Sequence, residues 1–232
     1  MNNRCVTVLS ILSAHKHLGA AQVRRTPLMK EVFLVETIRP LYRHWTKAFS
    51  FVRYLYGPYC EGVFHALDML IFHGLVEVIA FESTRGRVEA EYRITETGSS
   101  ILNTVGAWQQ KELASDLIWA LQALGIAQAK SITRLVYQEP AFVRILAEHG
   151  ESGVSAYAKT PIPAVTSANN ETLTILATLQ QLIHKPRIKG EETKAELATF
   201  QLPTREVVRL FLETLAQSVP RQRTGAAPWP SS

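Results

Sequence analysis

Residues 59–95 constrain the fold of this chain most strongly, because a helical pattern there runs directly into two strand patterns. Apolar side chains recur at helical spacing over residues 59–73, and Gly74 then provides the backbone freedom that commonly ends a helix. The stretch "LVEVIAFES" favours a strand, "TRGR" a turn and "VEAEYRIT" a returning strand. The sequence therefore predicts a helix followed at once by a β-hairpin.

Further helical patterns surround this unit. One helix is expected at about residues 4–18, a second over residues 28–39 and a long one over residues 99–124. The stretch "FSFVRYLYG" reads as extended, and Gly57 and Pro58 are expected to form a corner, with Pro58 in the first helical turn. This order of elements is that of a winged helix-turn-helix. We therefore expect a mainly α fold with a small β-wing and a C-terminal helical extension.

Composition indicates where this organisation changes. Gly, Ser, Pro and Asn dominate residues 150–170, and helical patterns resume after them, including one at residues 203–218. The expected organisation is a winged helix-turn-helix domain at 1–98, a helical extension packed on it at 99–149, a linker or long loop at 150–170, C-terminal helices at 171–218 and a disordered tail at 219–232.

Positive charge is concentrated in one part of the chain. The net charge is +5, while residues 21–53 carry seven basic and two acidic residues and residues 54–100 carry three basic and seven acidic residues. A basic segment beside an acidic one indicates a single surface that faces anions. The residues expected to contact nucleic-acid phosphates are Arg24, Arg25, Lys30, Arg43, Lys47 and Arg53, with Arg85 and Arg87 at the tip of the wing.

The helix at residues 59–73 is poorly equipped to read DNA bases. At 100° per residue, Val63, Leu67 and Leu70 form its core side. The opposite arc consists of Glu61, His65, Asp68 and Phe72. It contains no Lys, Arg, Asn or Gln, the residue types that usually contact bases and phosphates. Two carboxylates on this arc would face a polyanion.

Three interpretations of this helix remain open. In the first, other elements hold DNA, and the basic residues named above contact its phosphates. In the second, the domain docks a protein partner, with Phe72 as the anchor and the apolar face of residues 203–218 contributing. In the third, the arc is ordinary solvated surface and the C-terminal helices cover Phe72.

Catalytic and metal-binding chemistry is not indicated. His15 and His17 have no further ligand at metal-binding spacing, and Cys60 has no partnered base. A glycine-rich phosphate loop is also missing from the sequence. We therefore expect no enzyme activity, metal or cofactor. The two cysteines, Cys5 and Cys60, favour a reduced, cytoplasmic compartment, and no apolar run is long enough to span a membrane.

The stretch "YLYGPYCEGVFHALDMLIFHGLVEV", followed by "YRITETGSSIL", resembles a bacterial family of small winged-helix proteins of the YwgA type. The matching residues are Tyr56, Gly57, Pro58 and Tyr59 in the corner, Gly74 and Leu75 after the helix, and Ile94, Thr95, Glu96 and Gly98 before the next helix. Cys60 stands where serine is usual, and Leu67 and Asp68 are in reversed order. The resemblance covers about residues 5–140.

Similar winged-helix subunits occur in Lamassu-like antiviral defence systems, which pair an ABC/SMC-type ATPase with an effector nuclease. The resemblance therefore implies a non-enzymatic subunit of a bacterial defence or nucleic-acid-processing complex. Such a subunit would dock these protein partners and contact the DNA backbone non-specifically. The alternative is a sequence-specific DNA-binding transcription regulator.

Overall fold

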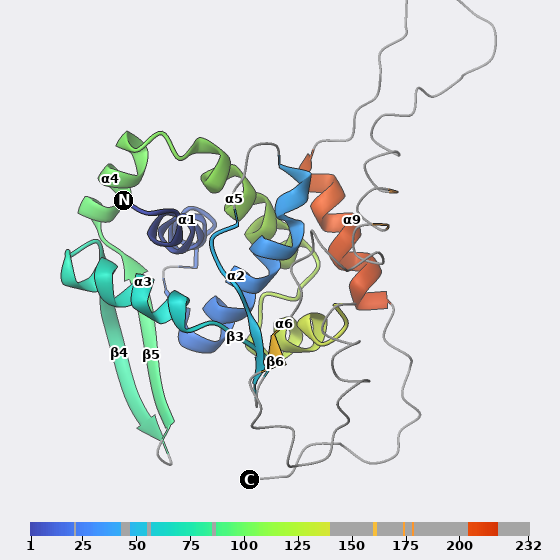
Figure 1. Cartoon of the computed structure of the whole chain (residues 1–232), viewed down its shortest axis with the longest axis horizontal. Helices are drawn as coiled ribbons and strands as arrows, with labels where there is room; N and C mark the ends of the chain where they lie inside the picture. The colour runs from blue at the N-terminus through green and yellow to red at the C-terminus, as the bar shows by residue number, and fades with distance from the viewer. Residues whose placement is uncertain are drawn as a thin grey trace, which may run out of the picture.

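The computed structural model describes most of the N-terminal half of the chain and one C-terminal helix. The described residues are 1–20, 22–42, 47–54, 57–84, 87–139, 160–161, 174, 178 and 204–217. Within them the protein is mainly helical with small antiparallel sheets, as the sequence predicts at that level (Figure 1). The helices are α1 (Asn3–His17), α2 (Arg25–Ile38), the 3-10 helix η1 (Arg39–Leu41), α3 (Glu61–Phe72), α4 (Glu96–Thr104), α5 (Trp108–Ala123), α6 (Ala129–Val136) and α9 (Thr204–Gln217).

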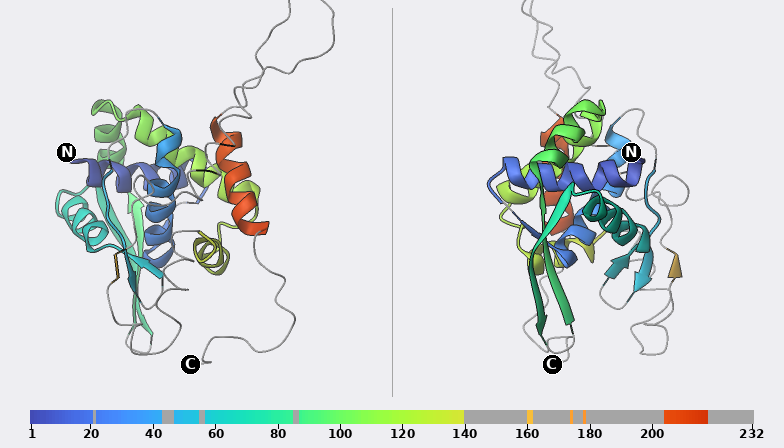
Figure 2. Two further views of the ribbon diagram at one scale, coloured as in Figure 1. Left: turned by 45° about the vertical axis from the view of Figure 1, so that its right-hand side comes forward. Right: turned by 90° about the vertical axis from the view of Figure 1, so that its left-hand side faces the viewer.

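The strands form two three-stranded sheets. The first has the order β1-β5-β4 and contains β1 (Val23–Arg24), β4 (Val76–Thr84) and β5 (Arg87–Ile94). The second has the order β3-β2-β6 and contains β2 (Val52–Tyr54), β3 (Gly57–Tyr59) and β6 (Thr160–Pro161). The predicted hairpin is confirmed: β4 and β5 pair antiparallel, with Val76 opposite Ile94. This hairpin extends beyond the helical body (Figure 2).

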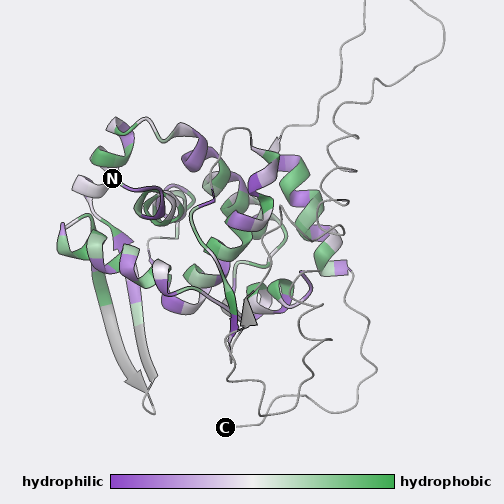
Figure 3. Cartoon of the chain, viewed as in Figure 1, coloured by the Kyte–Doolittle hydropathy of each residue, from purple (hydrophilic) through white to green (hydrophobic). Residues whose placement is uncertain are grey.

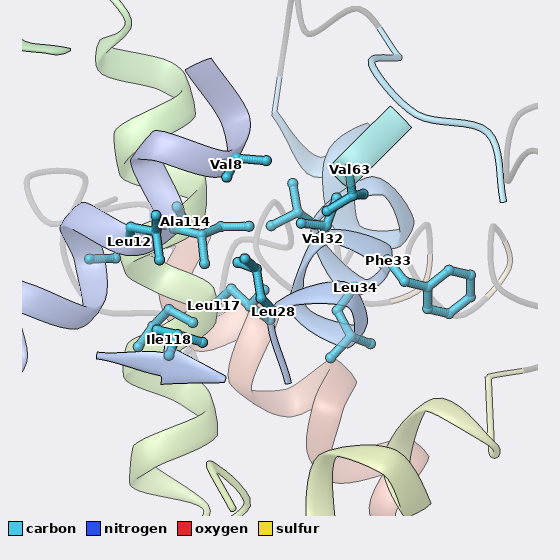
Figure 4. Packing of buried hydrophobic residues seen from close by; sticks show 14 of the residues in the cluster. Val8, Leu12, Leu28, Val32, Phe33, Leu34, Val63, Ala114, Leu117 and Ile118 are labelled. Carbon is cyan, nitrogen blue, oxygen red and sulfur yellow. The ribbon is translucent and has the colours of Figure 1, made fainter. Parts of the chain in front are cut away.

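Helix α1 lies in the centre of the helical body. Every residue from Cys5 to His15 is buried, although the sequence pattern indicates only an apolar stripe. Neighbouring elements cover all of its sides, because α3, α4, α5 and β5 pack around it. Figure 4 shows Leu12 of α1 beside Ala114 of α5. The buried hydroxyl of Thr7 is satisfied within the helix, where it donates to the Asn3 carbonyl at 2.8 Å.

The long helix expected over residues 99–124 is instead two helices. Helix α4 ends at Thr104, and α5 begins at Trp108. Between them Gly106 adopts φ +65°, a left-handed conformation that interrupts helical hydrogen bonding at little cost for glycine. Trp108, at the start of α5, is 64% exposed. The break lets α5 change direction and pack on α1.

The Gly57–Pro58 corner also differs from the expectation. Both residues lie in β3, where Pro58 is opposite Arg53 of β2, and α3 begins only at Glu61. Gly57 has φ +101°, and a Cβ atom there would collide with the Lys30 side chain. Glycine is favoured at this position because L side chains rarely adopt this positive φ, and the Lys30 side chain of α2 lies directly against it.

The apolar face of the C-terminal helix is confirmed, with one exchange of residues. The buried residues of α9 are Val207, Val208, Phe211, Leu212 and Leu215, whereas the expected Leu210 is only half-buried. This face packs against α5 and α6. It is therefore part of the core, and the expectation that it docks a partner is wrong. Residues 140–149 of the expected helical extension, most of residues 150–203 and the tail at 219–232 lie outside the described residues.

A buried polar cluster also joins α9 to the body. The Tyr42 hydroxyl donates to one carboxylate oxygen of Asp116 at 2.8 Å, and Arg205 Nε donates to the other at 3.3 Å. The Arg205 guanidinium also lies over the Trp119 ring, 5.2 Å from its centroid. Burial raises the pKa of Asp116, and the two donors oppose that rise.

Candidate functional site

Helix α3 has the two faces that its sequence predicts. Val63, Leu67 and Leu70 are buried and contribute to the core beside α1. Their spacing places them on one side of the helix. Hydrophobic and hydrophilic residues consequently alternate along the α3 ribbon in Figure 3. The inner face holds α3 in position by packing into the core. The outer face of α3 is therefore the one that could contact a ligand or partner.

The outer face of α3 consists of Glu61, His65, Asp68, Met69 and Phe72, all of which are exposed. Phe72 is 82% exposed, the highest value among the exposed large apolar residues of the described chain. The described C-terminal helix does not cover it. No Lys or Arg occurs anywhere in α3, so the outer face combines negative charge with apolar surface. His65 Nε2 lies 3.9 Å from the Glu61 carboxylate, one helical turn away.

Exposed apolar side chains gather at the junction between α3 and β4. Four of the seven large apolar residues that are exposed in the described part of the chain lie within residues 69–79. These four residues, Met69, Phe72, Val78 and Ile79, are called the α3–β4 corner below. The other three are Met1, Val105 and Trp108. Such a concentration of apolar surface is typical of an interaction site.

Sequence reasoning identified Phe72 but missed Val78 and Ile79. Strict alternation along a strand predicts that one of two neighbouring residues is buried. In the structure the β4–β5 register is irregular between Val78 and Ala80, and both Val78 and Ile79 are exposed, at 43% and 39%. An irregular register of this kind re-aims side chains. The run "VEVIA" contains no signal for it.

The start of α4 holds the corner in place. The Thr95 backbone N–H donates to the Leu75 carbonyl at 3.0 Å, and the Thr95 hydroxyl donates to the Gly74 carbonyl at 2.8 Å. The same hydroxyl accepts from the Gly98 N–H at 2.9 Å and so caps α4. Gly98 packs so closely on Leu75 that a Cβ atom there would collide with the Leu75 carbonyl oxygen. The turn after Phe72 is thereby anchored to a second helix.

An aromatic row supports the other end of α3. The ring centroids of Tyr54 and Tyr59 are 5.3 Å apart, and those of Tyr59 and Phe64 are 5.7 Å apart. The Arg25 guanidinium lies over the Phe64 ring, 3.8 Å from its centroid. Arg25 was expected to contact phosphates, and the structure instead places it on this ring.

Two of the expected phosphate contacts are buried. Lys30 is 2% exposed and Arg53 is 7% exposed, so neither side chain reaches the surface. Lys30 lies on α2 directly against Gly57 of β3, whereas Arg53 is a residue of β2 itself. Burial lowers the pKa of Lys30 to about 7. The assignment of these two residues to nucleic acid is therefore wrong for this conformation.

Only two of the remaining expected cations have described side chains. Arg24 is exposed, and its Nε donates to Glu91 at 2.8 Å. Lys47 is exposed. Arg87 begins β5, but its side chain is not among those described, and Arg43 and Arg85 lie outside the described residues.

One pair of titratable side chains is buried between two helices. His15 Nε2 lies 3.0 Å from Glu31 Oε2 in the interior, where the pair connects α1 to α2. No cluster of three or more His, Cys, Asp or Glu side chains suited to a metal ion occurs in the described part of the chain. Among the same residues, no helix has both the length and the apolar character needed to cross a bilayer.

A scan against protein-family models and a search of curated proteins find no match to this chain.

Proposed function

We propose that the protein is a non-enzymatic subunit that docks a protein partner through the outer face of α3 and the α3–β4 corner. The observation that carries this proposal is the 82% exposure of Phe72 on a helix face without a basic residue. Large, exposed aromatic residues beside other apolar surface are typical anchors of protein interfaces. Glu61 and Asp68 on the same face would repel the phosphates of DNA.

The arrangement of the strands supports the resemblance to winged-helix proteins. Strand β1 lies between α1 and α2 in sequence and pairs with β5, which pairs with β4 directly after α3. A winged helix is expected to contain, in this order, a helix, a short strand, two helices and a hairpin that pairs with that strand. On this basis the proposed setting is a bacterial antiviral defence or nucleic-acid-processing complex. Its proposed protein partners are an ABC/SMC-type ATPase and an effector nuclease.

Contact with the DNA backbone is a secondary part of the proposal. It is supported by the exposed side chains of Lys47 and Arg24, although Arg24 also pairs with Glu91. These contacts would be non-specific, because α3 lacks the side chains that read base edges. A sequence-specific regulator would require another element to read the bases.

The Phe72→Ala variant tests the docking proposal. We expect it to weaken binding to the partner by about 2 kcal/mol, or roughly 30-fold, because an exposed aromatic anchor is lost. Its melting temperature should not change, since Phe72 makes little contact with the core. The measurement is the affinity for each protein encoded beside this gene, by titration calorimetry after co-purification.

Trp108→Ala is the matched control, because Trp108 is also an exposed aromatic residue but lies at the start of α5. Equal affinities for Phe72→Ala and wild type would contradict the proposal.

Binding to DNA distinguishes the two proposed settings. We expect weak binding to random DNA and to upstream operon DNA alike, with an affinity that falls as salt rises, because only phosphate contacts contribute. Fluorescence anisotropy over a range of salt concentrations measures this dependence. Strong preference for one upstream site, retained when Arg24 and Lys47 are replaced by Ala, would instead support a transcription regulator.

A further inference from the structure

The carboxylates on the outer face of α3 lack the cation partners that nearby carboxylates have. Glu77 pairs with Arg93 at 2.7 Å, Glu91 pairs with Arg24 at 2.8 Å, and Glu96 pairs with Lys16 at 2.5 Å. Among the described residues, no Lys or Arg lies within ion-pair distance of Glu61 or Asp68, and only His65 approaches Glu61. Arg25, at the start of α2, is stacked on Phe64 instead.

The two carboxylates are spaced along one side of the helix. Glu61 and Asp68 are seven residues apart, which is two helical turns or about 10 Å. Phe72 and Met69 follow on the same exposed side at the C-terminal end of α3. The outer face of α3 is therefore an acidic strip that ends in an apolar corner.

On the basis of the proposed docking function, we infer that the occupant of this face is a basic amphipathic helix of a partner protein. Lys or Arg residues seven positions apart on that helix would match the spacing of Glu61 and Asp68, because both helices have the same rise per residue. Its apolar side would cover Phe72 and Met69 in the α3–β4 corner. Charge complementarity of this kind also selects between partners, because an acidic helix would be repelled.

The same charges disfavour two other occupants. A second copy of the chain that docked face to face would bring Glu61 and Asp68 of both copies together, since the same surface is used twice in a two-fold interface. A nucleic acid would place its phosphates against the two carboxylates. Both arrangements would place negative charges against each other.

The test uses the full chain and a displayed library of helical peptides. We expect the selected peptides to carry net positive charge, with Lys or Arg at positions i and i+7 and apolar residues beyond one end of that pair. The best such peptide is then synthesised and titrated at low salt. The double variant Glu61→Lys with Asp68→Lys should bind it at least tenfold more weakly, and a peptide with Glu at both cationic positions should recover the loss. Glu112→Lys, a reversal at an exposed carboxylate of α5, is the matched control and should bind as wild type does.

The possible results distinguish a failure of this inference from a failure of the proposed docking function. Selection of neutral or acidic peptides, or of none above background, overturns the inference. An unchanged affinity of the double variant for the peptide also overturns the inference. If Phe72→Ala still abolishes binding of the natural partner in that case, the docking function stands. If Phe72→Ala has no effect on that partner, the docking function itself fails. A dimer in sedimentation that Phe72→Ala dissociates would assign the face to a second copy.

Discussion

Replacing Gly98 with Ala is expected to lower the free energy of unfolding by about 3 kcal/mol, because the new methyl group collides with backbone. A Cβ atom at Gly98 would overlap the Leu75 carbonyl oxygen and would lie 3.0 Å from Cγ1 of Ile94. Neither neighbour can move freely, since the Leu75 carbonyl accepts the Thr95 N–H and Ile94 is buried. Thermal unfolding followed by circular dichroism should show a melting temperature lower by about 9 °C.

The direction of this effect is diagnostic. Gly98 lies within helix α4, where a Gly to Ala change ordinarily stabilises by about 1 kcal/mol. A loss of stability must therefore come from the contact with Leu75. Gly106→Ala is the control, because a Cβ atom there meets nothing within 4 Å and only its φ of +65° is costly, by about 1 kcal/mol. If both variants lose the same stability, the close packing of α4 on the α3–β4 turn is contradicted.

The second large effect concerns the buried amine of Lys30. We expect the free energy of unfolding to rise by about 3 kcal/mol between pH 7 and pH 10, and we expect Lys30→Met to remove this rise. Burial lowers the pKa of Lys30 to about 7 in the fold, from 10.5 in the unfolded chain. Between these values the unfolded chain binds a proton that the folded chain does not, so stability increases with pH. Below pH 7 the fold must hold the buried charge, and the penalty is complete.

Urea unfolding at a series of pH values measures this effect, and the difference between wild type and Lys30→Met isolates it from other titrating groups. Lys130→Met is the matched control, because Lys130 is exposed on α6 and its replacement should leave the pH dependence unchanged. Parallel curves for wild type and Lys30→Met would show that the Lys30 amine remains charged in the fold.

Much of the fold around α3 could be predicted from sequence because its signals are local. The cap at Thr95, the stop at Gly74 and the alternation of β5 each depend on residues within a few positions. The two faces of α3 follow from its helical spacing in the same way. The break at Gly106 was missed because an apolar pattern continues across it, although glycine itself is a signal for a helix end.

The candidate site could be predicted only in part. The exposure of Phe72 followed from its place opposite the buried residues of α3. The exposure of Val78 and Ile79 did not, because it depends on the register between β4 and β5. Basic residues were assigned to one surface from their closeness in sequence, yet Lys30 and Arg53 are buried, Lys30 against Gly57 of β3 and Arg53 within β2.

The amino-acid sequence by itself determined which segments become helices and strands near α3, and which side of α3 faces outward, because hydrogen bonding and periodicity act over a few residues. Only the tertiary structure decided which charges are buried, which apolar residues gather at the α3–β4 corner, and that the α9 face belongs to the core. Burial of a side chain depends on segments that are distant along the chain. Their packing is not encoded in the local pattern around that residue.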